Sequence, residues 1–431
     1  MRYPSDPRHK ARVFYFPWHS PAIYAIMRSD RGECMENAVR RELENRLSAG
    51  FGLESEAFIS VPGRTELIGN HTDHQRGCVV AAAVTLSLDA AAARTGDGRI
   101  HVLSEGMEPV DVALDSLDAR PSERGSSAAL VRGVAAGFAE RGFLPGKTGL
   151  ALAVSAGVPV GSGLSSSACF EVLVAAAMDA LLFGSGMSAA ELARIAQFAE
   201  NEYFGKPCGL MDQLACASGG ISAIDFADAR SPRLERLTLD LDAFGYTLCL
   251  VDSGAGHENL TAEYAAIAAE MRAVAGHFGR EVLRDVPERD LLASLGAIRA
   301  EHGDRAALRA MHFAAENRRA QEAADAIRGR DIARLLELIR ESGRSSGMYL
   351  QNLSVAGETR AQPLLVAQAV CEHALAGRGA VRVHGGGFAG SLLALVPGGE
   401  LERFRQTVDA VLGGGAVRPL HLRERGIAIE T

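Results

Sequence analysis

The stretch "TGLALAVSAGVPVGSGLSSSACFEVLVAAAMDALLFG", Thr148–Gly184, carries the clearest structural signal in the chain. Its first part predicts a strand that runs into a glycine-rich loop. Its last part is apolar on nearly all sides, which predicts a buried helix rather than an amphipathic surface helix. The stretch therefore joins a strand to a buried helix through a glycine loop.

The loop itself, Gly161–Ser167, has the composition of a phosphate site. Gly161 and Gly163 let the backbone turn tightly and approach a ligand. The serines Ser165–Ser167 then open the helix, where free N–H groups, hydroxyls and the positive helix end together favour an anion. An ordinary serine cap is the alternative, but a cap does not require three serines and two glycines. We therefore favour phosphate binding.

Outward from this stretch, the pattern predicts two lobes. The segments before it read as strands with interleaved helices, and "SAAELARIAQFAENEYFG" after it is a helix with Ser188 and Glu191 in a capping-box arrangement. The later half is rich in helix, with a long helical stretch from Thr261 to about Gly343 that breaks near Pro287 and Gly303. Two α+β lobes with a boundary near residues 225–250 follow from this change in composition.

The length, charge and cysteine content of the chain limit the class of protein it can be. A chain of 431 residues is too long for one small core. Its formal charge of −8 gives no electrostatic reason to expect a nucleic acid as partner. No apolar run reaches the roughly 18–20 residues of a membrane span, so no membrane partner is expected. The seven cysteines are scattered without a CxxC pair, which favours reduced thiols in a cytoplasmic protein over disulfides or a zinc site.

Residues 1–34 differ from the rest of the chain. They are basic and hold Trp18, the only tryptophan. Pro17, His19 and Pro21 interrupt the apolar stretch that a signal peptide would need. We interpret residues 1–34 as a disordered extension, residues 35–235 as the N-terminal lobe and residues 236–431 as the C-terminal lobe.

Two glycine-rich runs resemble nucleotide motifs without their context. "GFLPGKTG", Gly142–Gly149, is one residue short of a Walker A loop and lies between a helix and a strand, whereas a P-loop needs a strand and then a helix. "GGGFAG", Gly385–Gly390, matches GxGxxG, but the apolar run after it ends in Pro-Gly and reads as a strand. Neither run predicts a nucleotide site on its own.

Polar groups gather in "VPGRTELIGNHTDHQRG", Val61–Gly77, between two apolar segments. Such a mixture of charged and neutral groups suits a ligand with many hydroxyls, such as a sugar, better than a solvated loop. Metal binding by His71, Asp73 and His74 is a weaker alternative, because no other histidine or cysteine cluster completes a site. Further along, "CGLMDQL" surrounds Asp212 with apolar residues, and a carboxylate in this setting can act as a general base when a cation holds it ionised.

These runs, in this order, resemble the GHMP kinases and, within them, the galactokinases. "PGRTELIGNHTDHQRG" is similar to the galactokinase signature PGRVNLIGEHTDYNxG, and "VPVGSGLSSSA" to the ATP-phosphate loop of the family. "GKPCGLMDQ" resembles the run with the catalytic aspartate, and "HGGGFAGS" the third, glycine-rich motif. The resemblance covers about residues 36–431, and four motifs in order are far more specific than one.

The resemblance implies a two-lobed α+β fold, with an N-terminal lobe like ribosomal protein S5 domain 2 and an α/β-sandwich C-terminal lobe. It implies transfer of the γ-phosphoryl group of ATP to the anomeric hydroxyl of a sugar, with Mg²⁺ as cofactor. The expected partners are ATP and a small sugar, with no nucleic acid and no membrane, and the sequence leaves the oligomeric state open. Asp212 would be the base, and Arg64 would keep it ionised. Ser167 and Glu200 would hold Mg²⁺. The phosphate loop would comprise Gly161, Ser162, Gly163, Leu164, Ser165, Ser166 and Ser167, and the sugar pocket Asn70, His71, Asp73, Gly209 and Tyr264.

The chain departs from the family pattern on the sugar side. Asn70 replaces the usual glutamate, which lies near O6 of the sugar, and His74 replaces a tyrosine. "SGAGHENL" lacks an arginine two residues after the position of Gly254, and "ESGRSSGMYL" lacks the usual SHxSLRDDY. An amide in place of a carboxylate could donate a hydrogen bond to a uronate. The alternatives to a galactokinase are therefore a kinase for galacturonate, arabinose or N-acetylgalactosamine, an inactive sugar sensor, and a nucleotide-binding module.

Overall fold

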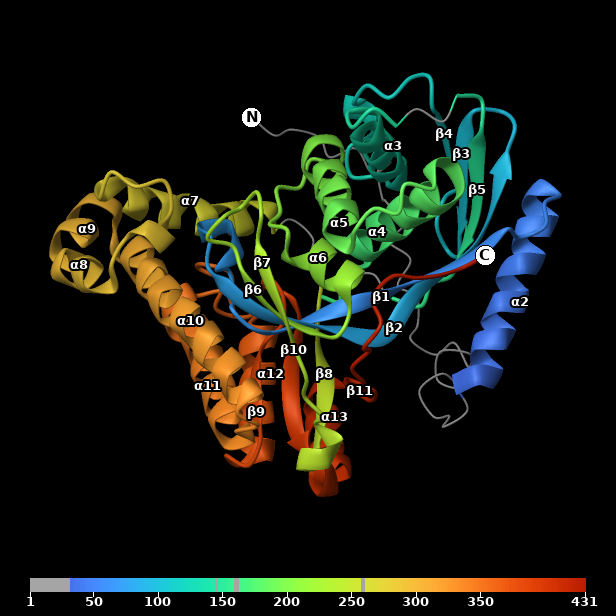
Figure 1. The fold of residues 1–431 in the computed structure, drawn as a ribbon. Helices are drawn as coiled ribbons and strands as arrows, with labels where there is room; N and C mark the ends of the chain where they lie inside the picture. The colour runs from blue at the N-terminus through green and yellow to red at the C-terminus, as the bar shows by residue number, and fades with distance from the viewer. Residues whose placement is uncertain (1–31, 144–145, 159–162, 257–259) are drawn as a thin grey trace, which may run out of the picture.

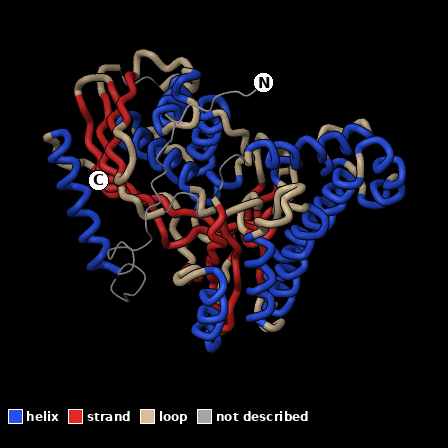
Figure 2. Tube along the Cα trace, turned by 180° about the vertical axis from the view of Figure 1, so that it is seen from behind, coloured by secondary structure: helices blue, strands red, loops and turns tan. Residues whose placement is uncertain are grey.

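The structure is a computed structural model that describes residues 32–143, 146–158, 163–256 and 260–431 (Figure 1). Two β-sheets form its centre, and helices cover them (Figure 2). The mixed α+β class predicted from the sequence is confirmed. The expected extension at residues 1–34 lies outside the described residues, apart from Gly32–Cys34, which begin helix α2 (Gly32–Phe51).

The larger sheet has eight strands, in the order β12-β1-β2-β5-β3-β4, with β6 pairing with β2 and β7 pairing with β6. A long antiparallel hairpin of β1 and β2 is its centre. The polar run predicted to bind sugar begins in β1 and continues through the turn of this hairpin, which includes the 3-10 turn Asp73–Gln75 (η1). The strands of this sheet are β1 (Ala57–Ile68), β2 (Cys78–Thr95), β3 (Arg99–Ser104), β4 (Val110–Ala113), β5 (Gly149–Val154), β6 (Ile221–Asp225), β7 (Arg233–Leu237) and β12 (Ala428–Glu430).

Helices pack on both faces of the larger sheet, which explains why β1 and much of β2 are buried on both sides. Helix α2 covers one face, where Leu43 and Leu47 meet Phe58 and alanines of β2 and β5. Buried helix α4 packs on the other face against β1 and β2. The capping box of Ser188 and Glu191 is confirmed. The helices of this second face are α3 (Ser127–Ala139), α4 (Ser166–Met178), α5 (Ala189–Phe198) and α6 (Met211–Ser218), with π-helical turns at Asp179–Phe183 and Ala199–Phe204.

The smaller sheet is antiparallel, in the order β11-β8-β10-β9, and helices α12 (Pro363–Leu375) and α13 (Leu401–Leu412) pack beside it. Its strands are β8 (Tyr246–Ala255), β9 (Ala380–Val383), β10 (Gly390–Pro397) and β11 (Val417–Leu420). The run "GGGFAG" forms the turn between β9 and β10, so a strand follows it as the sequence predicts. Helix α3 and strand β5 likewise flank Gly142–Gly149, which excludes the strand-then-helix context of a P-loop.

A helical arm completes the second half. It contains α7 (Thr261–His277), α8 (Glu288–Ala293), α9 (Leu295–His302), α10 (Asp304–Arg328) and α11 (Ile332–Ser345). The breaks at residues 278–287, which end at Pro287, and at Gly303 were expected, whereas those at Ser294 and at residues 329–331 divide the helical stretch further. Helix α10 matters most for the site, because it packs against α11 and also against β2 of the larger sheet (Figure 1).

The end of the chain returns to the first sheet. Strand β12 pairs with β1 through Phe58 and Glu430, and β7 extends the same sheet to Leu237. The larger sheet therefore takes strands from both ends of the described chain. A division of the chain near residue 235 stays a proposal.

The statement that no apolar run reaches the length of a membrane span was wrong. The run Ser166–Phe183 is long and apolar enough to cross a membrane by length and composition. It is the helix α4 with its π-helical turn, and 67 % of the run is buried inside the fold, where it forms part of the main core. Its apolar character has an explanation in packing within the protein.

Candidate active site

A bidentate ion pair between Arg64 and Asp212 lies at the centre of the site. Arg64 is on β1, directly after a register shift between Pro62 and Arg64, and Asp212 is in the first turn of α6. Arg64 Nε donates to Asp212 Oδ1 at 2.8 Å and Nη2 to Oδ2 at 2.7 Å. The side chains are 5 % and 21 % exposed. Burial raises the pKa of Asp212, but the Arg64 guanidinium outweighs it and holds that pKa at about 2.

The loop Gly161–Ser167, called the serine loop below, contacts this pair through Gly163 and Ser165. Ser165 Oγ donates to Asp212 Oδ2 at 2.5 Å, and Arg64 Nη1 donates to the carbonyl of Gly163 at 2.5 Å. Gly163 has a φ of 80°, and a Cβ on it would lie 2.7 Å from His384 Nδ1, so both the backbone and the space require glycine. Ser166 begins helix α4, whose N-terminus lies beside the carboxylate. Gly161 and Ser162 lie outside the described residues.

A buried carboxylate, that of Glu200, contacts the last residue of the serine loop. Glu200, in the π-helical turn Ala199–Phe204, is 1 % exposed and accepts a hydrogen bond from Ser167 Oγ at 3.0 Å. Lys206 Nζ lies 2.8 Å from its Oε1, and Cys208 Sγ and Gln213 Nε2 donate to its Oε2. The two residues expected to bind metal are therefore in contact, and a lysine is in contact with the same carboxylate.

A second acidic group faces Asp212. Asp73, in the hairpin turn, lies directly over Gly209, because a Cβ on Gly209 would be 1.8 Å from Asp73 Oδ2. Burial raises the pKa of Asp73 to about 7, and repulsion from Asp212 adds to the increase. The position at 209 must be glycine for the Asp73 carboxylate to occupy this space. The structure thus groups Asp73 and Gly209 with Asp212.

His71 and Tyr264 meet at the glycine turn between β9 and β10. His71 Nε2 donates to the carbonyl of Gly386 at 2.9 Å, and Tyr264 Oη donates to that of Gly387 at 2.9 Å. Burial lowers the pKa of His71 to about 4, so its imidazole is neutral, and raises that of Tyr264 to about 12. Both side chains reach the turn that the GGGFAG run builds. The run therefore has a place in the site without being a dinucleotide fingerprint.

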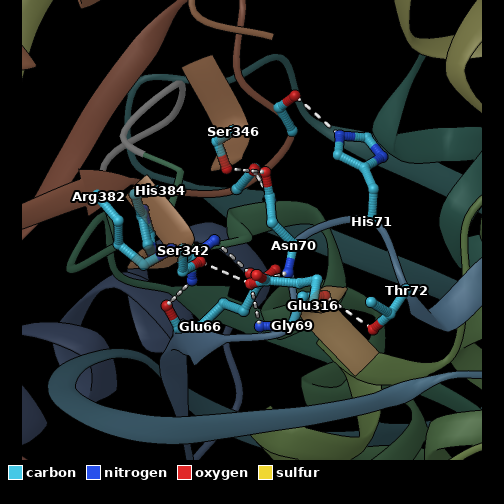
Figure 3. A network of polar contacts seen from close by, with 12 residues as sticks. Glu66, Gly69, Asn70, His71, Thr72, Glu316, Ser342, Ser346, Arg382 and His384 are labelled. Carbon is cyan, nitrogen blue, oxygen red and sulfur yellow. Dashed lines mark hydrogen bonds and ion pairs between the residues drawn. The ribbon is translucent and has the colours of Figure 1, made fainter. Parts of the chain in front are cut away.

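Asn70 points into the protein rather than toward an open surface. It is 1 % exposed; its Nδ2 donates to the carbonyl of Gly385 at 2.7 Å, and its Oδ1 accepts from Asn352 Nδ2 at 2.9 Å and from Ser346 Oγ at 3.3 Å (Figure 3). Helix α10 holds its backbone, since His312 donates to its carbonyl. The amide therefore connects the hairpin turn of the first half to the glycine turn of the second.

Several buried residues that the sequence did not single out hold this connection. Glu316 on α10 accepts from the backbone N–H groups of Gly69 and Asn70, from Ser342 Oγ and from Arg319 Nε (Figure 3). Burial raises its pKa, but Arg319 and other cationic neighbours hold that pKa at about 2. The charged side chains in "MHFAAENRRAQEAADAIR" look like the solvated face of a helix, so no sequence signal identified Glu316.

A second buried pair links the two sheets beneath the site. Arg382 on β9 donates to the carboxylate of Glu66 at 2.6 Å and to its backbone carbonyl at 2.9 Å. His384, at the end of β9, is hydrogen-bonded to Thr65 through its Nε2 at 3.0 Å. Arg64, Thr65 and Glu66 thus contact Asp212, His384 and Arg382 in turn. No pattern along β1 identified Glu66, because every residue of the strand is buried.

Comparison with known proteins places these features in a family. The family described as GHMP kinases N terminal domain matches residues 129–220, and the galactokinase galactose-binding signature matches residues 47–94. The galactokinase of Streptomyces coelicolor is 33 % identical over 394 residues, which are 89 % of this chain and 96 % of that protein. The galactokinase of Actinobacillus pleuropneumoniae serotype 5b is 30 % identical over 84 % of this chain and 91 % of its own length.

Solved structures share the fold. The crystal structure of Lactococcus lactis galactokinase complexed with galactose covers 91 % of this chain and 99 % of its own, with a TM-score of 0.77 and 24 % identity. A D-glycero-D-manno-heptose 1-phosphate kinase from Bacteriodes thetaiotaomicron has a TM-score of 0.58 at 16 % identity, over 87 % of this chain and 99 % of its own. At these identities the likeness is one of fold.

Proposed function

The chain belongs to the galactokinase family, and from this premise we propose that it transfers the γ-phosphoryl group of ATP to the anomeric hydroxyl of galactose. The observation that carries the proposal is the Arg64–Asp212 pair, whose carboxylate accepts a hydrogen bond from Ser165 of the serine loop and lies close enough to Asp73 to help raise the pKa of Asp73. An ionised carboxylate between a phosphate loop and a sugar site is the arrangement that phosphoryl transfer to a hydroxyl requires.

Asp212 accepts the proton of the sugar in this proposal. The O1 oxygen attacks the γ-phosphorus, the bond from phosphorus to the β–γ bridging oxygen breaks, and ADP leaves with that oxygen. The O1 proton passes to the Asp212 carboxylate. With a pKa of about 2, Asp212 is a weak base, so the proton moves late, when the new P–O bond has already made the hydroxyl acidic. Arg64 keeps the base ionised and stabilises charge that develops beside it.

ATP occupies the serine loop in this proposal. The described loop residues Gly163–Ser167 lie beside the phosphates, and the N-terminus of α4 attracts their charge. Gly161 and Ser162 of the same loop lie outside the described residues. Ser167 and Glu200 fit Mg²⁺, because a hydroxyl and a carboxylate are hard oxygen donors and lie 3.0 Å apart beside that loop. When bound, Mg²⁺ neutralises charge on the phosphates. Ser165 orients the base through its hydrogen bond to Asp212.

Galactose occupies the space beside Asp73, His71 and Tyr264. The Asp73 carboxylate is a hydrogen-bond acceptor for sugar hydroxyls, and Gly209 leaves room for it. His71 and Tyr264 already use one polar atom each on the glycine turn, so they fix the shape of the pocket around the sugar. Asn70 supports this wall from behind through Gly385 and Asn352.

The contacts of Asn70 therefore do not favour galacturonate over galactose as the substrate. The galacturonate alternative depends on an amide that is free to donate, whereas Nδ2 and Oδ1 of Asn70 both have protein partners at 1 % exposure. We propose galactose as the substrate for this reason. The free thiols of the six described cysteines support the further proposal that the protein works in the reducing cytoplasm.

A substrate panel tests the proposed function. The purified protein is assayed for ADP formation with Mg-ATP and galactose, galacturonate, N-acetylgalactosamine, arabinose or glucose. We expect the highest kcat/KM for galactose. Preference for galacturonate would contradict the role given to Asn70, and sugar binding without any turnover would replace the kinase by a sugar sensor.

A further inference from the structure

All four strong acceptor positions of the Glu200 carboxylate are in use. Ser167 Oγ and Lys206 Nζ contact Oε1 at 3.0 Å and 2.8 Å, and Gln213 Nε2 and Cys208 Sγ contact Oε2 at 2.7 Å and 3.1 Å. Each carboxylate oxygen has two lone pairs, so four donors satisfy it. A divalent cation can bind Glu200 only if it replaces one of these donors.

Lys206 differs from the other three donors. Its side chain is 56 % exposed, while Glu200 is 1 % exposed, so the ammonium reaches in from solvent on a flexible four-carbon stem. Gln213 is fully buried, and Ser167 is itself expected to bind the metal, so Lys206 is the donor that a metal would displace. Lys206 is also one of three lysines in the chain, beside Lys10 and Lys147, where arginine supplies nearly all the positive charge.

We propose that the ammonium group of Lys206 binds the Glu200 carboxylate in the free enzyme and competes there with the divalent metal. The inference rests on the proposed function, in which Ser167 and Glu200 hold Mg²⁺. An ammonium at 2.8 Å from Oε1 stands where a cation ligated by Oε1 would approach, and two cations at one oxygen repel each other.

The competition makes metal binding depend on nucleotide. Without ATP, Lys206 has Glu200 as its partner and the metal must displace it. With ATP present, the polyphosphate offers the ammonium another anion, because lysine binds phosphate as a mobile point charge. Lys206 therefore keeps the site free of metal until the substrate that needs the metal has arrived.

Binding of Mn²⁺ to the enzyme without nucleotide tests the proposal, with electron paramagnetic resonance to count free Mn²⁺. We expect Lys206→Met to bind Mn²⁺ at least tenfold more tightly than the wild type, and Lys206→Arg to stay within about threefold of it. Lys147→Met is the matched control, because it removes a lysine from an exposed loop and should leave the affinity unchanged. With a non-hydrolysable ATP analogue, the gain from Lys206→Met should shrink.

The double variant Lys206→Met with Glu200→Gln locates the metal. We expect it to lose the affinity gained by the single variant. Equal or weaker Mn²⁺ binding by Lys206→Met would overturn the proposal, and so would a gain that survives Glu200→Gln. Thermal unfolding of each variant shows whether it is folded. Failure of the proposed function itself is seen separately, as absence of galactose turnover by the wild type.

Discussion

Replacement of Arg64 by methionine should move the acid limb of the pH–rate profile. The N–O distances of 2.7–2.8 Å put the two charge centres about 4 Å apart, where an effective dielectric constant of about 20 gives about 4 kcal/mol of attraction. That attraction corresponds to about 3 pKa units. Without it the pKa of Asp212 rises from about 2 to about 5 or above, because only Ser165 and Lys206 then oppose the effect of burial.

Initial rates of ADP formation between pH 4 and 9 measure this shift. In the wild type, Asp73 should give the acid limb near pH 7, and protonation of Asp212 should not add to it anywhere in that range. In Arg64→Met a second protonation, at Asp212, should make the fall steeper below about pH 5. At pH 8, where Asp212 is ionised in both proteins, the variant should still be about 10²–10³-fold slower, because it lacks a buried charge at the transition state.

A second buried arginine provides the control. Arg132 donates twice to the Glu123 carboxylate and once to a backbone carbonyl, as Arg64 does, but its partners are not site residues. Arg132→Met should lower stability and leave the pH profile unchanged. The reasoning is refuted if Arg64→Met keeps the wild-type acid limb, or if Arg132→Met moves it equally.

Three further changes have expected outcomes. Gly209→Ala should raise the KM for galactose at least tenfold with little change in the KM for ATP, because its Cβ would meet Asp73 Oδ2. A galactose KM equal to that of the wild type in steady-state kinetics would contradict this. The wild-type kcat/KM for galactose should rise from pH 6 to pH 8 as Asp73, with a pKa of about 7, becomes an ionised acceptor, and Asp73→Asn should flatten the rise. Glu316→Gln should cost about 3–5 kcal/mol of unfolding free energy in urea, because Arg319 loses a buried partner; a loss below 1 kcal/mol would show that the network is not stabilising.

Local patterns predicted the parts of the fold that depend on local physics. The strand, glycine loop and buried helix of Thr148–Gly184 give one signal each, namely periodicity, glycine content and an all-round apolar face. The return of β12 to β1 had no such signal, because pairing between Phe58 and Glu430 depends on tertiary packing across the whole chain. The apolar run Ser166–Phe183 shows a related limit of local patterns. A core helix and a membrane span have the same composition, so only the burial of this run inside the fold tells them apart.

The site divides in the same way. The types and order of Arg64, Asp212 and the serine loop could be recognised, because each belongs to a run with its own chemistry. The orientation of Asn70 could not, since it depends on Ser346 and Asn352, about 280 residues away and in a segment without a recognisable motif. Sequence position near a sugar motif suggested a pocket residue, and the structure adds that its amide contacts Gly385, Ser346 and Asn352.

Phosphorus NMR of the reaction product tests the central claim most directly. The wild type is incubated with Mg-ATP and galactose, and the same experiment is run with Asp212→Asn, which keeps the shape of the side chain and removes its charge. The account predicts galactose 1-phosphate from the wild type and a rate at least 10³-fold lower from the variant. Phosphate on another hydroxyl, or an Asp212→Asn variant as fast as the wild type, would contradict it.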